Sequence, residues 1–450
     1  MDKYREYCRQ AFNLNAYLDE YLDELKDLLT KEAADEGSGG IWLREELDGL
    51  KALLREDGHD LRNKDCQLQK LTEKYMKKEC DRTEFVTWPL KMISLQQEIE
   101  NQYRLVDIMH RHFNGFEALE AGDYGCHIDY GRPKRTVKVE EVLAEYFGTE
   151  EAALVRGGGT GAIRALCFAT IKSGNRILVH EAPMYKTTQI TLEGLGADIV
   201  RTDFNDFANI ERELKKGIAV LYIQRVRQHL HDRYDAIGII EKVRKIDDKV
   251  RIVVDENYAV NKVAKVGAAV GADASTFSMF KLLGTPGIGL IVGKRELIDI
   301  VHQQNYSGGG QVQGPEAMEV LRSLVNNPVL LGVQGLAVDE ITERLNNGEV
   351  PHVEKALKAN IEERIILVKL DLPIAREVIS RAIELGGLPH PVGSESRFEI
   401  QALFYRVAKV MLDADPIYGK YVIRINPMRS GPETVIRILR ESIEYVMKAS

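Results

Sequence analysis

The sequence lacks the marks of several classes of protein. Its five cysteines are scattered, and none has the spacing of a metal site. Such cysteines are typical of reduced thiols, so we expect the cytoplasm and no bound metal. No apolar run approaches the roughly 18 residues of a membrane span, and the opening MDKYREYCRQ has no signal-peptide core. We therefore expect no membrane partner.

The net charge is modest as well. A formal charge of −8 provides no strongly basic surface, which disfavours a nucleic acid as partner. Hydrophobic residues make up 44% and charged residues 29% of the chain, as in ordinary globular proteins. Because 450 residues exceed what one hydrophobic core usually serves, we expect more than one domain.

Sequence patterns divide the chain into three parts. Residues 1–115 carry Leu and Tyr at helical spacing and predict a helical N-terminal arm, as in LNAYLDEYLDELKDLLTKEAADE and LQQEIENQYRLVDIMHRHF. Residues 116–325 alternate helical segments with short apolar runs and predict a large α/β domain with a mainly parallel, seven-stranded sheet covered by helices on both faces. Residues 326–450 mix helices and strands and predict a small C-terminal α+β domain.

The elements expected in the two domains follow from apolar periodicity and glycine stops. The expected strands of the large domain are ALV, RILVHEA, ADIVRTD, AVLYIQR, RIVVDEN, STFSM and GLIVG. Its helices include KVEEVLAEYFG, ended by Gly148, and AIRALCFATIKSG, ended by Gly174. The small domain is expected to hold the helix AREVISRAIELGG, the strands RFEIQALFYRV and YVIRINP, and the final helix PETVIRILRESIEYVM.

The run RGGGTGAIRAL at 156–166 lies between an expected strand and an expected helix. The first turn of a helix offers unpaired N–H groups to an anion, so the run predicts a phosphate site. It fits the dinucleotide fingerprint G-x-G-x-x-A, with Glu181 placed for a ribose, which would indicate an NAD-binding oxidoreductase. It also suits the single phosphate of pyridoxal 5′-phosphate (PLP), which in addition needs a lysine, an acid and usually an aromatic ring.

The further groups that PLP requires are present downstream. Lys281, in FSMFKLLGTPGIG, follows an expected strand and precedes a glycine-rich turn, and its flanks are apolar. A desolvated lysine at such a strand end is a suitable nucleophile for a Schiff base. Asp255 ends the apolar strand RIVVD, where a carboxylate can keep the pyridine nitrogen protonated. The PLP interpretation is therefore preferred.

Five motifs in order, GGTGAIR, HEAPMY, VVDENY, FSMFK and YVIRINP, resemble the fold-type I PLP enzymes of the aspartate aminotransferase superfamily. FSMFKLLGTPGIGLIVGKRELI is similar to the selenocysteine-synthase-like branch. DYGRPKRTVKVEEVLAEYFG, with its Y-x-R, is similar to the Cys/Met-metabolism branch. The resemblance covers about residues 120–300 and the Arg424 motif.

The resemblance implies roles for individual residues. Lys281 matches the Schiff-base lysine, Asp255 the pyridinium partner and Tyr258 the tyrosine that bonds the ring hydroxyl. The residues that match the phosphate cup are Gly158, Gly159, Thr160 and Ser278. Tyr185 matches the stacking aromatic, with His180 as the alternative ring. Tyr130 and Arg132 match a pair that reaches the phosphate from a neighbouring subunit, and Arg424 matches the arginine that binds the substrate carboxylate.

Two features depart from the family pattern. No arginine follows Lys281 closely to neutralise the phosphate, so Arg132 or the helix N-terminus is expected to do so. The Asn-Pro signature of aminotransferases is replaced by IQRVRQH, which makes Gln224, Arg225 and Arg227 candidates for the site. Because of this replacement, the sequence leaves the reaction type open.

The expected protein is a PLP-dependent enzyme acting on the Cα or Cβ of an amino-acid substrate. We rank a transferase first, by transamination or replacement, and a C–S or C–N lyase or a racemase as the alternative. An NAD-binding oxidoreductase and a non-catalytic scaffold remain as rivals. The resemblance also implies a homodimer or higher homo-oligomer, with the active site at the subunit interface.

Overall fold

The computed structural model describes residues 85–227, 229–360, 364–392 and 395–449, all within the unit Arg82–Ser450. The first helix predicted in the arm, LNAYLDEYLDELKDLLTKEAADE, lies outside the described residues. The second is present as α5 (Leu95–His112). Helix α5 begins at a capping box, in which Ser94 and Gln97 exchange side-chain-to-backbone hydrogen bonds.

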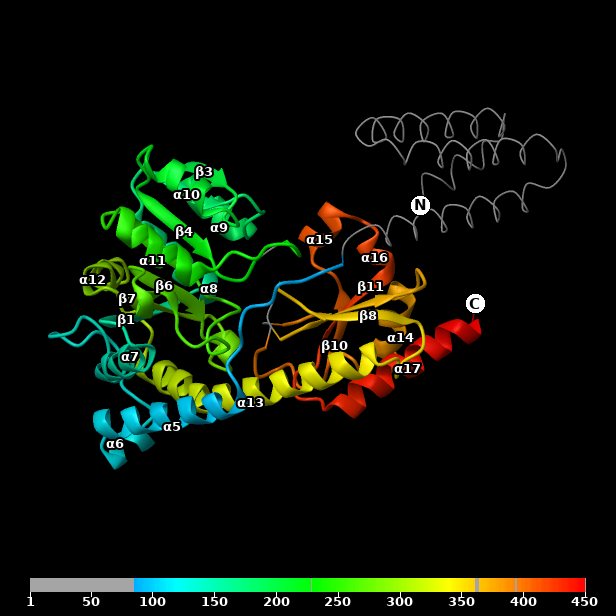
Figure 1. Ribbon diagram of the computed structural model, residues 1–450. Helices are drawn as coiled ribbons and strands as arrows, with labels where there is room; N and C mark the ends of the chain where they lie inside the picture. The colour runs from blue at the N-terminus through cyan, green and yellow to red at the C-terminus, as the bar shows by residue number, and fades with distance from the viewer. Residues whose placement is uncertain (1–84, 228, 361–363, 393–394, 450) are drawn as a thin grey trace, which may run out of the picture. The chain divides into compact units, whose positions relative to one another are not determined.

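Seven strands form the larger sheet, in the order β1-β7-β6-β5-β4-β2-β3 (Figure 1). Their bounds are β1 (Glu151–Arg156), β2 (Arg176–His180), β3 (Asp198–Thr202), β4 (Val220–Gln224), β5 (Arg251–Asp255), β6 (Ala274–Ser278) and β7 (Ile288–Gly293). Strands β2 to β6 pair in parallel, whereas β7 is antiparallel to both β1 and β6. The predicted mainly parallel sheet is confirmed.

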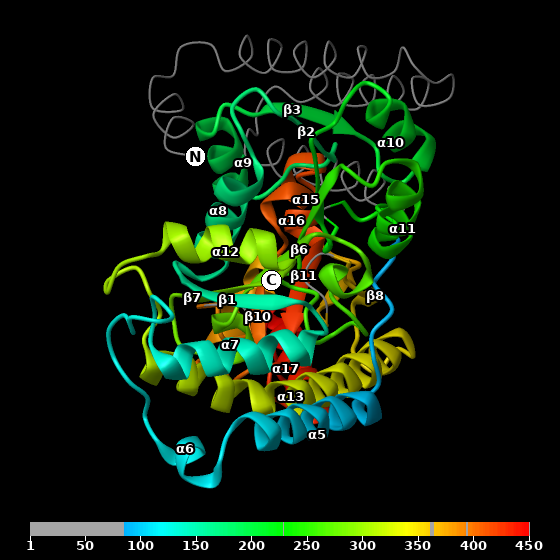
Figure 2. The same cartoon turned by 90° about the vertical axis from the view of Figure 1, so that its left-hand side faces the viewer.

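Helices cover both faces of this sheet, because alternate strand residues are apolar on either side. The helices on one face are α8 (Gly158–Thr170), α9 (Lys186–Gly194) and α12 (Arg295–Gln304). Those on the other face are α7 (Lys134–Phe147), α10 (Phe207–Leu214) and α11 (Ala236–Ile246). Helices α5 and α13 (Gly314–Asn346) pack beside α7, as Figure 2 shows, and the short α6 (Gly115–Leu119) follows α5.

The smaller sheet is antiparallel throughout, in the order β10-β11-β9-β8. Its strands are β8 (Val353–Lys358), β9 (Ile366–Leu370), β10 (Leu403–Arg406) and β11 (Val422–Asn426). Its apolar face packs against α13, α14 (Ala375–Glu384) and α17 (Pro432–Ala449), and the short helices α15 (Lys409–Ala414) and α16 (Tyr418–Tyr421) precede β11. The predicted small α+β domain is confirmed.

Several element predictions differ from the structure. RFEIQALFYRV forms a strand only at Leu403–Arg406, since the N–H of Ala402 donates to the Ser430 side chain instead of a neighbouring strand. Helix α8 ends at Thr170, before Gly174, because a turn follows in which Asn175 accepts the N–H of Lys172. The 33-residue helix α13 and strands β8 and β9 were not predicted. The domain limits at 115/116 and 325/326 stay predictions, and the second falls inside α13.

Two features are absent from the described part of the chain. No helix there combines the length and the apolar content required to cross a bilayer. No group of three or more His, Cys, Asp or Glu side chains there is arranged to hold a metal ion.

Candidate active site

A pocket of about 120 Å³ lies where β4, β5 and β6 end. Gln224, Asp255 and Ser278, the last residues of these strands, line it. Predicted site residues from other elements also line it: Gly159, Thr160, Tyr185, Tyr258 and Lys281. The structure thus brings together side chains that are more than 120 positions apart in the sequence. As expected for a doubly wound sheet, the pocket is at the carboxyl ends of parallel strands.

The glycine run forms the turn from β1 into α8. Gly157, the N-cap of α8, has φ of +95° and Gly158 has φ of +62°, values that favour glycine. The N–H groups of both donate to Gly287 O, at 2.7 and 2.9 Å. Gly159 and Thr160 therefore lie in the first helical turn, where N–H groups find no intrahelical carbonyl and attract anions.

Asp255 is 4% exposed and lies beneath the pocket in a set of hydrogen bonds. Its Oδ2 accepts from the Tyr222 hydroxyl at 3.2 Å, and its Oδ1 accepts from the backbone N–H and the side chain of Asn257, at 3.0 and 2.8 Å. Burial raises the pKa of Asp255, while the hydrogen bonds from Asn257, the charge of Lys281 and the hydrogen bond from Tyr222 oppose this rise. The carboxyl is thus held in one orientation by its neighbours.

Asn257 also lines the pocket and was not among the predicted residues. Its Oδ1 accepts the N–H of Ser278 at 2.9 Å, while its Nδ2 donates to Asp255. A Cβ at position 159 would lie only 2.3 Å from the same Oδ1, so Gly159 must be glycine for the two to approach. One side chain therefore fixes the acid, the end of β6 and the glycine turn.

Lys281 lies in the 3-10 turn Phe280–Leu282 that follows β6. Its Nζ is above the ring of Tyr258, 3.3 Å from the ring centroid. The hydroxyls of Tyr258 and Tyr185 are 2.9 Å apart, and their rings are stacked with centroids 6.4 Å apart. The pocket therefore contains the amine of Lys281 and the two hydrogen-bonded hydroxyls of Tyr185 and Tyr258.

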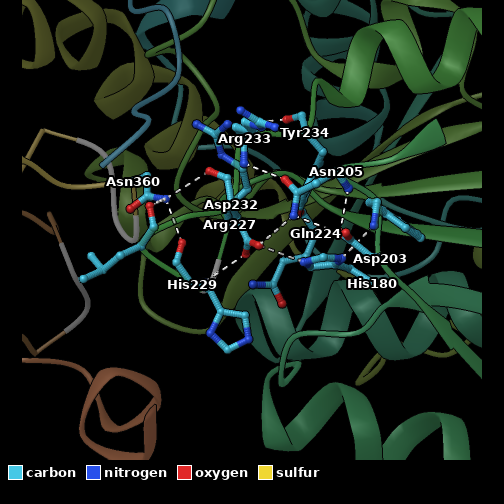
Figure 3. Close-up of polar contacts among 12 residues, drawn as sticks. His180, Asp203, Asn205, Gln224, Arg227, His229, Asp232, Arg233, Tyr234 and Asn360 are labelled. Atoms are coloured by element: carbon cyan, nitrogen blue, oxygen red, sulfur yellow. Dashed lines mark hydrogen bonds and ion pairs between the residues drawn. The ribbon is translucent and has the colours of Figure 1, made fainter. Parts of the chain in front are cut away.

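His180, the alternative stacking ring, does not line this pocket. It is buried against the rings of Phe204 and Tyr234, and Figure 3 shows its contact with Asp232. Its Nδ1 accepts the N–H of Phe204 at 3.1 Å, so the proton is on Nε2, which donates to Asp232 at 3.1 Å. This arrangement assigns His180 to the support of the loop after β4.

The same loop contains two more of the candidate residues. Arg225 is 7% exposed, and its Nη1 donates to both oxygens of Glu256, at 3.1 and 3.0 Å, and to Lys265 O. Arg227 is buried and donates to the carbonyls of Trp88 and Tyr234. The structure brings neither arginine to the Lys281 pocket, whereas Gln224 lines it.

Three other predicted residues lie apart from this pocket as well. Arg132 donates from Nε to the buried Glu140 at 2.7 Å and from Nη1 to Tyr130 O at 3.1 Å. Tyr130 itself is 49% exposed. Arg424, on β11, donates from Nε to Arg406 O at 2.8 Å. Asn426, two residues further on the same face of β11, lines a small cavity that Tyr258 also lines.

The pocket residues fit PLP. A glycine turn at a helix start suits a phosphate, a buried acid suits a protonated ring nitrogen, and Lys281 supplies the amine. The 2.3 Å approach at Gly159 shows that this turn leaves no space for a side chain. The phosphate, the ring nitrogen and the Schiff-base linkage of PLP therefore each have a matching residue in the pocket.

Comparisons with known proteins agree with this chemistry. Residues 112–325 match the family model of the Cys/Met metabolism PLP-dependent enzymes, and residues 339–439 match that of the YhfS-like C-terminal domain. The uncharacterized protein YhfS of Escherichia coli K12 is 42% identical over 361 residues, or 80% of this chain and 99% of that protein. The crystal structure of Escherichia coli YhfS, described as pyridoxal-5′-phosphate dependent, has a TM-score of 0.78 over the same shares of the two chains.

More distant structures share the fold. Cystathionine gamma lyase of Micromonospora echinospora is 17% identical, with a TM-score of 0.58 over 70% of this chain and 87% of that one. Cystathionine gamma synthase of Xanthomonas oryzae pv. oryzae is 15% identical, with a TM-score of 0.59 over 78% of this chain and 99% of that one.

Fold and pocket together define a fold-type I PLP-dependent enzyme. The chain belongs to the Cys/Met metabolism family of PLP-dependent enzymes. PLP is its cofactor and small amino acids are the substrate class of its family. The dinucleotide interpretation of the glycine run is therefore wrong.

Proposed function

We propose that this enzyme is a lyase or replacement enzyme acting on an amino acid with a leaving group at Cβ or Cγ. The observation that carries the proposal is the pair of hydroxyls on Tyr185 and Tyr258, 2.9 Å apart and next to Lys281. Such a pair can protonate a leaving group, which transamination does not require. The Cys/Met family match favours the lyase alternative over the aminotransferase-like reaction of the transferase ranked first from sequence.

Bound PLP supplies the electron sink that allows the substrate's Cα–H bond to break. When PLP is bound, Lys281 would form the covalent attachment and Asp255 would pair with the ring nitrogen. The N–H groups of Gly159 and Thr160 and the hydroxyls of Thr160 and Ser278 would donate to its phosphate. Gly158 has the positive φ that the turn into α8 requires.

The protein's own groups move the protons of the reaction. The amine of Lys281 would take the proton from Cα. A leaving group at Cβ then departs with its bonding electron pair, whereas a leaving group at Cγ departs only after the Lys281 amine has also removed a proton from Cβ; in both cases the Tyr185 hydroxyl provides the proton to the leaving atom. Tyr258, bonded to that hydroxyl, can return a proton to Tyr185, and solvent restores the pair.

The substrate's carboxylate is proposed to bind Arg424, supported by the position of Arg424 on the β11 face that also carries Asn426. Gln224 is the candidate for a further substrate contact, since it lines the pocket. Arg225 is left out of the proposal, because its guanidinium is committed to Glu256 inside the protein.

Tyr130 and Arg132 are proposed to reach the phosphate of a second copy of the chain in a homodimer. The segment around them is unusually apolar at the surface, with Phe116, Leu119 and Ile128 each more than 80% exposed. Light scattering measures the oligomeric state. Mixing Lys281→Ala and Arg132→Ala chains should then restore activity in mixed dimers, and no restoration would contradict shared sites.

The lyase proposal is tested by separating Cα–H cleavage from loss of the leaving group. In D₂O, Tyr185→Phe should still exchange the Cα proton of a substrate, while release of ammonia and keto acid falls by about 100-fold. Tyr103→Phe is the matched control, since Tyr103 is 67% exposed on α5. If exchange and product release fall by the same factor, the hydroxyl has no separate role in the leaving-group step.

The substrate is found by screening amino acids against the holoenzyme. Sulfur-containing and phosphorylated amino acids are added while the visible band of lysine-bound PLP is followed. A change of this band together with release of a thiol, phosphate or ammonia supports the proposal. Release of an amino group to a keto-acid acceptor, without loss of a side-chain group, would favour an aminotransferase.

A further inference from the structure

A second cavity, of about 360 Å³, shares no lining residue with the Lys281 pocket. It opens to the surface and is bounded by residues 89–94, by the start of α5, by α13 and by the end of β8. Its walls are largely apolar, with Leu90, Ile93, Leu336 and Val338 among them. A volume of this size is in the range of cavities that hold small organic molecules.

The cavity contains the buried guanidinium of Arg364, which is 4% exposed. Its Nη2 donates to Glu98 Oε1 at 2.9 Å and to Ile93 O at 3.4 Å. Its Nε and Nη1 are buried and, within the described part of the chain, have no hydrogen-bond partner. Because buried N–H groups without partners are costly, these donors indicate an acceptor that enters the cavity.

Glu98 balances the charge of Arg364 only in part. It contacts the guanidinium through Oε1 alone, and its Oε2 is buried without a partner in the described residues. Burial raises the pKa of Glu98 to about 7, against the lowering effect of Arg364. Near neutral pH this carboxyl is therefore partly protonated, and the cavity then keeps a positive charge.

Two glycines inside α13 line the cavity, although each disfavours a helix by about 1 kcal/mol relative to alanine. A Cβ at Gly332 would be 2.7 Å from Leu95 Cδ1, so packing against α5 explains that glycine. A Cβ at Gly335 would meet only the Arg364 side chain, 3.4 Å from Nε, 3.6 Å from Cζ and 3.8 Å from Cδ. Gly335 is therefore not required by packing, and it keeps the space beside the guanidinium open.

We propose that this cavity binds a small organic monocarboxylate. The carboxylate accepts from Nε and Nη1 of Arg364, and the hydrocarbon part lies against Leu90, Ile93 and Leu336. A monoanion suits a single guanidinium better than a phosphate dianion. The other cation of the cavity, Lys358, already pairs with Asp339 at 2.5 Å. Arg364 holds its position with φ of +66°, a strained value for arginine that is common at ligand sites.

The test is octanoate binding to the full-length holoenzyme, measured by calorimetry, with 1-octanol as the uncharged probe. We expect octanoate to bind with a Kd of about 1 mM or below and 1-octanol to bind at least about tenfold more weakly. Equal binding of the two probes, or no octanoate binding up to about 5 mM, would overturn the proposal.

Substitutions in the cavity test whether octanoate binds there. The double variant Glu98→Gln with Arg364→Met removes the guanidinium without leaving a charge unpaired, and it should weaken octanoate binding by at least about tenfold. Glu98→Gln alone keeps Arg364 and should bind at least as well as the wild type. Gly335→Leu fills the cavity, keeps both charged groups and should block binding even if the double variant folds poorly. Wild-type affinity in both the double variant and Gly335→Leu would refute the site.

Discussion

The amine of Lys281 lies on the face of the Tyr258 ring, with Nζ 3.3 Å from the ring centroid. The face of a phenol ring carries negative charge density, so it attracts an ammonium group and fixes its direction. The hydroxyl of the same ring bonds to Tyr185. The ring of Tyr258 contacts Lys281, whereas its hydroxyl contacts Tyr185, so substitutions can separate the two roles.

Tyr258→Phe keeps the ring and removes the hydroxyl, whereas Tyr258→Leu removes both. We expect Tyr258→Leu to bind PLP about tenfold more weakly than Tyr258→Phe, as a ring contact of about 1–2 kcal/mol implies. Titration of the apoprotein with PLP, followed by its visible band, measures both affinities. Equal weakening in the two variants would assign the effect to the hydroxyl.

Asp255 must be ionised to pair with a protonated ring nitrogen, so acidification should release PLP. Burial raises the pKa of Asp255, and the Asn257 side chain opposes the rise. Asn257→Ala therefore moves this pKa further up, and PLP should leave at a higher pH than in the wild type. Retained PLP is measured after dialysis across a pH series. Asn209→Ala, which removes a hydrogen bond to Asp203 O, is the control and should leave the midpoint unchanged.

Much of the site could be predicted because its signals are local. The strand that ends at Asp255 is a short apolar run, and the glycine turn after Lys281 returns directly into β7. The long helix α13 was missed because Pro328 and two lining glycines interrupt the helical pattern of its sequence. Its helical state is maintained by packing against α5, α7 and β8, which the sequence pattern does not reveal.

Two errors within the site have a physical cause. Neighbouring residues at a strand end point to opposite sides, so Gln224 and Arg225 cannot both face one pocket. Gln224 is in register with Asp255, and the residue after each, Arg225 and Glu256, forms the buried ion pair behind them. This alternation was available from the sequence. The role of Asn257 was not, because it depends on the approach of two separate segments.

The buried carboxyl of Glu140 is expected to make the stability of the protein depend on pH. Burial raises its pKa from 4.5 to about 7, with Arg132 opposing and Glu151 adding to the rise. The folded state thus binds this proton more tightly than the unfolded state. The stabilisation is complete below about pH 4.5 and is lost as the pH rises through 7.

Glu140→Gln should remove this dependence. Between pH 5 and 8, the free energy of unfolding of the wild type should fall relative to the variant by up to about 3 kcal/mol, measured by urea unfolding. Glu98 titrates in the same range but is present in both proteins, so it cancels in the difference. His302, whose pKa burial lowers from 6.5 to about 3, takes up a proton on unfolding in the lower part of this range, but it is present in both proteins and cancels in the same way. If the difference in free energy of unfolding between the wild type and Glu140→Gln does not change with pH, Glu140 stays ionised when buried.

The glycine turn yields a prediction in which one atom decides the outcome. Gly159→Ala places a Cβ 2.3 Å from Asn257 Oδ1, so either the turn or Asn257 must move. Because Asn257 also holds Ser278 and Asp255, we expect PLP affinity to fall by at least about tenfold, which corresponds to 1.4 kcal/mol. Gly194→Ala, on α9 with nothing within 4 Å of the added Cβ, should bind PLP as the wild type does. Combining Gly159→Ala with Asn257→Ser removes the clashing oxygen and should restore part of the affinity, since the phosphate turn can then return to its position. If Gly159→Ala lowers PLP affinity as much in the Asn257→Ser background as in the wild type, the contact with Asn257 is not what requires glycine at this position.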